Sequence, residues 1–154
     1  MEIKEVRDDI YSRFLQKCTD YDFIELDEET VYDNMEGWLH SVASLPYVRV
    51  KFKTFSLNDE VLKMNWELKN SIDDNSDELF VIEVFAQGMI IQWLEPKVKS
   101  ILNVKQFFGG KEEKFYSQAN HLNELRSLLS DANISLRKLL RDHGYIINSY
   151  ISEE

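Results

Sequence analysis

The chain has few of the residues that cross-link a fold or mark a secreted protein. Cys18 is its one cysteine, which excludes an intramolecular disulfide framework and any zinc site built from cysteines. We expect Cys18 to fill a small buried space, and the protein to be made in a reducing, intracellular environment. The first nine residues lack the basic-then-apolar pattern of a signal peptide, so we expect the product to stay in the cell that makes it.

Positive charge is also scarce. The sequence holds 18 basic and 28 acidic residues, which gives a formal net charge of -10. Such a charge repels nucleic acid and anionic membranes at long range, and this disfavours tight binding to either. A protein that surrounds DNA without gripping it is still compatible with this charge, because a repulsive wall would let the polymer slide.

Catalytic motifs are missing as well. The sequence has no Gly-x-Ser-x-Gly elbow, no phosphate-binding loop and no Gly-x-Gly-x-x-Gly turn. His40, His121 and His143 do not form a zinc-binding pair, and we expect surface or helix-end roles for them. Carboxylates cluster at 20–29 and 73–78, in polar connectors where we expect them to be solvated, and neither cluster has calcium-loop spacing. We therefore predict a protein that is not an enzyme and uses no cofactor or metal.

The feature around which the chain is organised is the apolar run Leu79–Leu94, which three polar residues interrupt. A helix that is apolar nearly all round must be enclosed, and this run is too short and too polar for a membrane span. We predict a buried central helix at about 77–95 within one domain, 1–154. Gly88 predicts a close crossing by another helix, and Pro96 predicts a bend or a restart.

The remaining segments predict a mainly α fold. Apolar residues recur at helical spacing from Ile3 to Cys18 and again from 28 to 44, where Pro46 ends the second helix. A long C-terminal helix at about 117–143 carries a heptad-like apolar seam, made of Leu122, Leu125, Leu129, Ala132, Leu136 and Leu139. That seam needs an apolar partner, either the central helix or the same helix of a neighbouring subunit.

Between these helices the apolar period changes from 3.6 to 2, which predicts a β-hairpin at about 47–68. In the first strand Val48, Val50 and Phe52 would alternate with a basic stripe. The second strand, around 62–68, is also compatible with a helical turn. The basic stripe consists of Arg49, Lys51 and Lys53, and Lys63 of the second strand could face the same side. It is either a solvated strand face or a surface that contacts an acidic copy of the chain or DNA in a channel.

Four segments between residues 79 and 150, roughly half of the chain, carry a resemblance. They are Met89–Pro96, Phe107–Gly109, Tyr116–Leu122 and Tyr145–Asn148. With these segments the chain resembles the head-to-tail connector (adaptor) proteins of tailed bacteriophages that infect Gram-positive bacteria. The conspicuous hairpin and the absence of a clear basic cluster depart from that family, so a portal-proximal adaptor and a neighbouring neck protein both stay open.

The resemblance implies a structural protein of the virion neck, made in the cytoplasm of the bacterial host. A ring, commonly of twelve subunits, would sit between the portal and the tail, and the genome would pass through it. The partners would be the portal protein, copies of the chain itself, the next neck or tail-completion protein, and double-stranded DNA that passes without tight binding, with no membrane.

The end of the chain is unusually apolar for a terminus. We refer to residues 145–154 as the C-terminal segment and predict that a foreign surface covers it. Under the resemblance it would dock on the portal or on a neighbouring subunit, through Tyr145, Ile146, Ile147, Tyr150 and Ile151.

Two other functions compete with the connector. An acidic inhibitor or DNA mimic would bind a nucleic-acid enzyme through the carboxylates at 20–29 and 73–78, and its binding would be strongly sensitive to salt. An enzyme that uses dispersed residues, which no motif reveals, is the weaker alternative.

Overall fold

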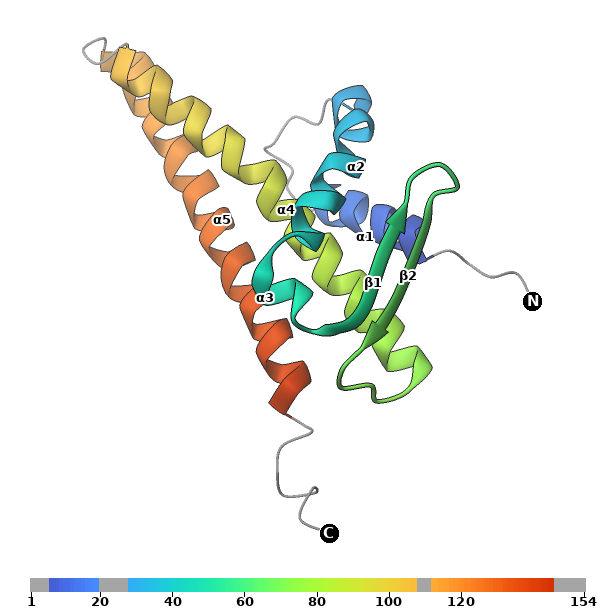
Figure 1. Cartoon of the computed structure of the whole chain (residues 1–154). Helices are drawn as coiled ribbons and strands as arrows, with labels where there is room; N and C mark the ends of the chain where they lie inside the picture. The colour runs from blue at the N-terminus through green and yellow to red at the C-terminus, as the bar shows by residue number, and fades with distance from the viewer. Residues whose placement is uncertain (1–5, 20–27, 108–111, 146–154) are drawn as a thin grey trace.

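A computed structural model describes residues 6–19, 28–107 and 112–145, with side chains for 6–18, 33–100 and 121–143. Five helices and a two-stranded antiparallel hairpin follow one another in these ranges (Figure 1). The elements are α1 Val6–Thr19, α2 Glu28–Ala43, α3 Pro46–Arg49, β1 Phe52–Asn58, β2 Lys63–Leu68, α4 Asp74–Phe107 and α5 Glu112–Tyr145. The prediction of a mainly α bundle with a β-hairpin is confirmed.

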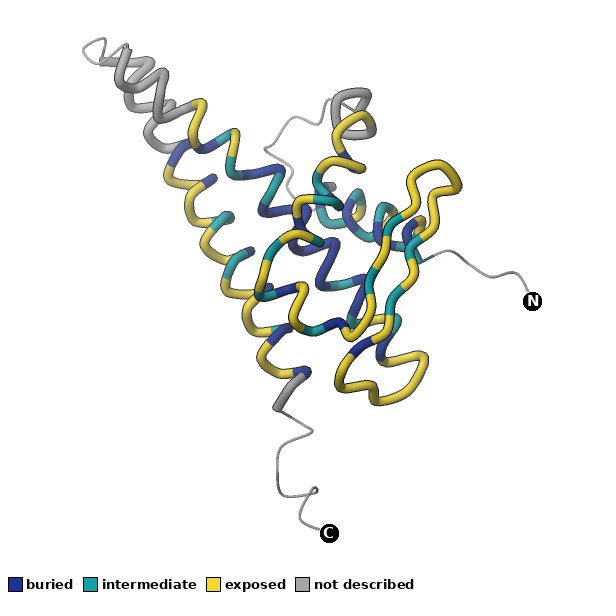
Figure 2. The backbone as a smooth tube through the Cα atoms, in the orientation of Figure 1, coloured by how far each residue is buried: buried dark blue, intermediate teal, exposed yellow. Residues whose placement is uncertain are grey.

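Helix α4 is the core of the molecule. Every residue from 84 to 91 on it is buried, and α1, α2 and α5 pack against it, as the dark-blue path through the centre of Figure 2 shows. The predicted central helix is therefore confirmed, although it begins at Asp74 and runs on through Pro96 to Phe107 instead of ending near 95.

By length and composition alone, α4 could also cross a membrane, because the helix extends beyond the apolar run Leu79–Leu94 at both ends. The segment Asp74–Ser100 is 27 residues long and is apolar enough to cross a membrane. However, 72% of its most apolar window is buried inside the protein. That burial is the reason to interpret α4 as a core helix.

The predicted close crossing at Gly88 is confirmed. A Cβ atom placed on Gly88 would lie 2.7 Å and 2.8 Å from the two γ-carbons of Val42 on α2. Real Cβ atoms do not approach other carbons so closely, and Val42 is itself fully buried. The glycine therefore allows the backbone of α4 to lie directly against the side chains of α2.

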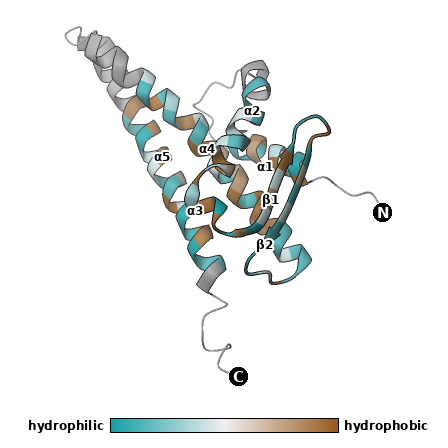
Figure 3. Ribbon diagram, viewed as in Figure 1, coloured by the Kyte–Doolittle hydropathy of each residue, from teal (hydrophilic) through white to brown (hydrophobic). Residues whose placement is uncertain are grey.

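Helices α4 and α5 lie side by side and project together beyond the other elements to the end where the chain connects them (Figure 1). The predicted seam of α5 faces α4, and its buried residues continue one turn further to Leu140 and His143. Charged residues occupy much of the remaining surface of α5 (Figure 3). The seam thus finds its partner within the same chain, which is one of the two alternatives left open by the sequence.

The start of α4 is fixed by carboxylates that the sequence analysis placed in a solvated connector. Asp73 accepts a hydrogen bond from the backbone N–H of Ser76 at 2.8 Å, as an N-cap residue does. Asp77 is 5% exposed and accepts hydrogen bonds from the Ser71 hydroxyl and the Ile72 N–H. The expectation of solvation was wrong for Asp77, because its carboxylate satisfies donors of the preceding loop.

The predicted first strand begins too early by five residues. Residues 46–49 form a helical turn, α3, since Pro46 suits the first helical position and Leu45 before it is extended. Within this turn Val48 is fully buried, whereas Val50 after it is 56% exposed. The second strand, whose type the sequence left open, is β2.

A β-bulge at Lys53 sets which side chains of the hairpin face the core. Phe52 pairs with Leu68 but Thr54 pairs with Glu67, so Lys53 has no partner in the register. The extra residue places Phe52 and Phe55 on the same side, with ring centroids 5.1 Å apart. Both rings also contact Phe85 of α4, at 6.0 Å and 5.6 Å. This aromatic cluster attaches the hairpin to the central helix.

Candidate functional site

A groove of about 600 Å³ lies between the α3 turn and the last third of α5. Its apolar part includes Val50 and Ile134, which are 56% and 62% exposed and are among the most exposed large apolar side chains described. Four basic side chains and no acidic one line the same groove, and the full lining is Tyr47, Val50, Lys51, Ile134, Arg137, Lys138, Leu140 and Arg141. We call this surface the basic groove.

The basic groove concentrates positive charge in a molecule with a net charge of -10. The Arg137 guanidinium lies 5.2 Å from the centre of the Tyr47 ring, a cation–π contact that connects α5 to α3. Arg141 is in contact with Asp142 at 3.3 Å, and both side chains are more than half exposed. An apolar floor with a cationic rim fits a ligand that carries apolar side chains and negative charge.

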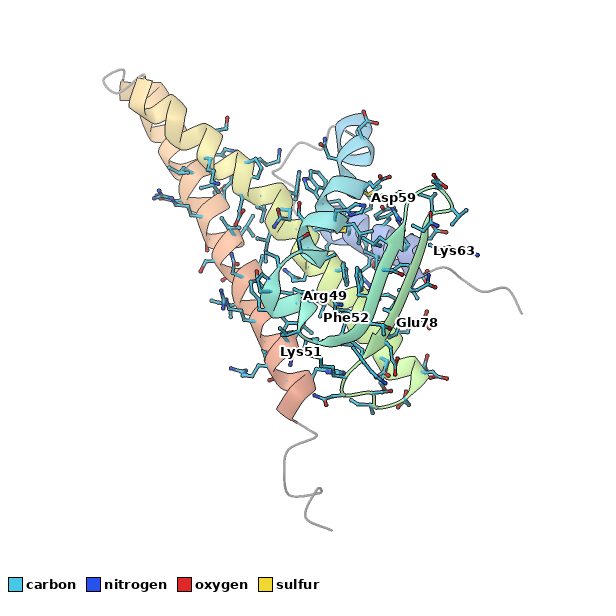
Figure 4. The ribbon with its side chains drawn as sticks, in the orientation of Figure 1. Arg49, Lys51, Phe52, Asp59, Lys63 and Glu78 are labelled. Carbon is cyan, nitrogen blue, oxygen red and sulfur yellow. The ribbon has the colours of Figure 1, made fainter. Side chains whose placement is uncertain are left out.

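The predicted basic stripe does not form a single face. In Figure 4, Arg49 and Lys51 lie at the base of the hairpin and Lys63 lies at its opposite end. Lys53 is bound to Glu67 across the strands at 3.2 Å, and Arg49 donates to the Phe52 carbonyl at 2.9 Å. The α3 turn and the bulge break the alternation on which the single basic face was predicted, and Lys51 is the one member that lines the basic groove. The contact of these residues with DNA or with another subunit stays a prediction.

His143 lies in the last turn of α5, which is the helix-end position that was expected, but it is buried beside the basic groove and not at the surface. It is 8% exposed and stacks on Phe80 of α4, with ring centroids 3.9 Å apart. Neither of its ring nitrogens has a hydrogen-bond partner among the described residues. Burial, assisted by the nearby charge of Lys51 and opposed by that of Asp77, lowers the pKa of His143 below its ordinary value of 6.5.

This burial predicts a pH effect on stability. A histidine with a lowered pKa binds protons more readily in the unfolded chain, so stability is lost as the pH falls through 6.5 toward the folded-state pKa. We expect His143→Phe, which keeps a ring against Phe80, to flatten the decline in unfolding free energy between about pH 7 and pH 5. Denaturant titrations at several pH values measure how the unfolding free energy depends on pH, with His121→Phe on the same helix as the control. If the unfolding free energy of His143→Phe falls with pH as steeply as that of the unsubstituted chain, protonation of His143 is not the cause of the decline.

A second polar cluster joins the tip of the hairpin to α1 and α2. Arg7 is fully buried, and its Nη1 and Nη2 atoms lie 3.0 Å from Asp59 and 3.7 Å from Glu36. Its Nε donates to the Tyr11 hydroxyl at 3.2 Å, and His40 Nε2 lies 2.8 Å from Asp59. Desolvation would raise the pKa of Asp59, but the adjacent His40 and Arg7 outweigh it and lower that pKa.

This cluster has the ligand types of a metal site, but it also contains the positive charge of Arg7. Within the described residues, Glu36, His40 and Asp59 each bring one ligand atom within 4.8 Å of the others. The single positive charge of the Arg7 guanidinium is already paired with both carboxylates, and it would repel a cation bound between them. We therefore interpret the cluster as the attachment that fixes the hairpin tip to the helices.

The C-terminal segment begins where α5 ends, one helical turn or so beyond the basic groove. Tyr145 is the last residue of α5, and Ile146, Ile147, Tyr150 and Ile151 lie outside the described residues, as does the predicted apolar turn at 108–110. Of the predicted interface residues, the structure thus places only the backbone of Tyr145, four positions after Arg141 on α5. Sequence analysis missed Arg137, Lys138 and Arg141.

Comparison with protein-family models, with curated proteins and with solved structures gives no match for this chain. The functional argument therefore depends on the residues and on the geometry described above.

Proposed function

We propose that this chain is a structural subunit of a bacteriophage neck, which forms a ring between the portal and the tail. In the ring, α4 and α5 of each copy would stand beside those of the next, and the genome would pass through the middle. The resemblance of Met89–Pro96 to connector proteins suggested this function, and the segment is part of the buried helix α4.

The observation that carries the proposal is the placement of a basic apolar groove beside the start of an apolar C-terminal segment. The groove lies near the end of α5 from which residues 146–154 continue, and we propose that the groove and these residues each bind a neighbouring subunit. A subunit with one such surface for each of two neighbours can form a closed ring by repetition of one contact. The acidic remainder of the surface would not hold passing DNA.

The alternative of an acidic inhibitor has less support from the described residues. It requires free carboxylates at 20–29 and 73–78. The side chains of the first cluster lie outside the described residues, and in the second cluster Asp73 caps α4 and Asp77 is buried with two donors. No particular observation favours an enzyme over the ring subunit.

The test is to mix the purified chain with the portal protein of the same genome and to image the particles by negative staining. The proposal predicts rings on the portal, whereas the chain alone stays monomeric or loosely associated. If the portal particles carry no added density at any ratio of chain to portal, the proposed function is wrong.

A further inference from the structure

We propose that the basic groove of one copy of this chain binds residues 146–154 of a second copy. This inference rests on the ring of the proposed function and names the contact that closes it. The occupant is chosen by its chemistry, by its charge and by the length of chain beyond α5.

The chemistry of the two surfaces is complementary. Residues 146–154 read Ile-Ile-Asn-Ser-Tyr-Ile-Ser-Glu-Glu, with four large apolar side chains followed by two acidic ones and no basic residue. The basic groove offers the exposed apolar side chains of Val50 and Ile134, and around them lie Lys51, Arg137, Lys138 and Arg141. Apolar side chains would cover the floor while Glu153 and Glu154 approach the basic rim.

A second depression among the described residues suits this acidic segment less well. This depression, at the start of α4, also contains an exposed apolar residue, Leu79, which is 53% exposed. Its charged lining is mixed, with Asp9 and Glu78 beside Arg13, and Arg13 is already bound to Glu83 at 3.1 Å. An acidic segment would be attracted only weakly to this mixed charge. Leu79 therefore provides a control position with the exposure of the groove residues but without their positive surroundings.

The length of the chain favours a second copy over the same copy. Ile134 lies eleven residues before Tyr145 on α5, roughly 16 Å along the helix axis. The β-branched Ile146 and Ile147 oppose a reversal directly after the helix, so the first residues suited to a turn are Asn148 and Ser149. The five residues after them span at most about 17 Å. Residues 146–149 would first lead away from the end of α5, so part of this length would be used to return to that end. Tyr150 and Ile151 would therefore not reach Ile134 in the same copy.

Disulfide trapping between two different copies tests this contact. One sample of the full chain carries Ile134→Cys or Val50→Cys in the groove, and the other carries Tyr150→Cys or Ile151→Cys. Native Cys18 does not compete, because it is fully buried and burial raises the pKa of its thiol to about 12. Mixed under mild oxidation, at least one of the four pairs should give covalent dimers in at least tenfold excess over the Leu79→Cys control.

Charge reversal provides an independent readout. Arg137→Glu with Lys138→Glu should lower the yield of the best disulfide pair at least tenfold, and Glu153→Lys with Glu154→Lys in the other copy should restore it. Both groove positions are exposed, so the variants should fold, as their unfolding transition can verify. Two results of these mixtures would overturn the proposal: dimers no more abundant than with Leu79→Cys, or no restoration by the swapped charges. A further variant carries both cysteines of a pair in one chain, and cross-links that form only within single chains of this variant would also overturn it.

The outcomes separate this contact from the proposed function. Trapped dimers without any ring on the portal would support the groove contact and contradict the phage-neck role. Rings on the portal without trapped dimers would support the neck role and contradict this use of the groove.

Discussion

A chain that ends at Tyr145 should fold like the full chain and fail to form rings on the portal. The core that the structure describes is formed by residues between Val6 and Leu140, so we expect the unfolding free energy to change by less than about 0.5 kcal/mol. Ring formation should be lost completely, because each copy would lack the apolar side chains that we propose to lie on its neighbour. Analytical ultracentrifugation and negative-stain images of the mixture with portal measure the two effects.

Point variants refine this prediction within the full-length chain. Ile151→Asp should abolish rings, since it places a charge among apolar groups, whereas Ser149→Ala in the same segment should leave them unaffected. If the shortened chain assembles on the portal as well as the full chain does, the C-terminal segment has no docking role.

Gly88→Ala should destabilise the protein by about 1–3 kcal/mol, even though alanine is the better helix former. The added Cβ would lie 2.7 Å from a γ-carbon of Val42, so α2 and α4 must separate or Val42 must leave its buried position. Gly37→Ala is the matched control, because a Cβ there meets no atom within 4 Å. That substitution should stabilise α2 by about 0.5–1 kcal/mol. Urea denaturation of the two variants measures the difference.

A double substitution tests whether the contact between position 88 and Val42 causes the loss of stability in Gly88→Ala. Val42→Ala removes both γ-carbons, so in the Gly88→Ala background it should cost less than it does alone, a coupling of about 1 kcal/mol or more. If Gly88→Ala is as harmless as Gly37→Ala, α2 does not cross α4 at this position.

The sequence was sufficient for the helices because their apolar spacing extends over many turns. Helix α4 was recognisable from its continuous apolar run, and Gly88 correctly indicated where α2 crosses. The seam of α5 was equally clear, but periodicity alone could not say whether its partner lay in the same chain. The structure decides that point in favour of α4.

The errors arose where a local pattern had two physical explanations. The second helix does end before Pro46, as predicted, but a proline can also begin a helix, and only the backbone shows that Pro46 begins α3. The bulge at Lys53 adds one residue to a strand, which no alternation of residue types reveals. Arg7 lies between apolar positions of α1, where the residue pattern gives no sign of burial, yet it is fully buried against Tyr11, Glu36 and Asp59.

The basic groove could be predicted only in part. Lys51 was identified within the basic stripe, but Arg137, Lys138 and Arg141 lie some 90 residues later, on a helix face that looks simply solvated in the sequence. The α3 turn and α5 become neighbours through their shared packing, and the sequence gives no direct sign of that approach. A signal was present in the spacing of 134, 137, 138 and 141, which places them on one face of α5.

The mass of the isolated neck particle that contains this chain tests the ring most directly. The account predicts that native mass spectrometry finds the chain together with the portal, in a multiple near twelve times its 18.3 kDa, about 220 kDa. Recovery of the chain as a free 18.3 kDa species, or in a one-to-one complex with a nucleic-acid enzyme, would contradict the account.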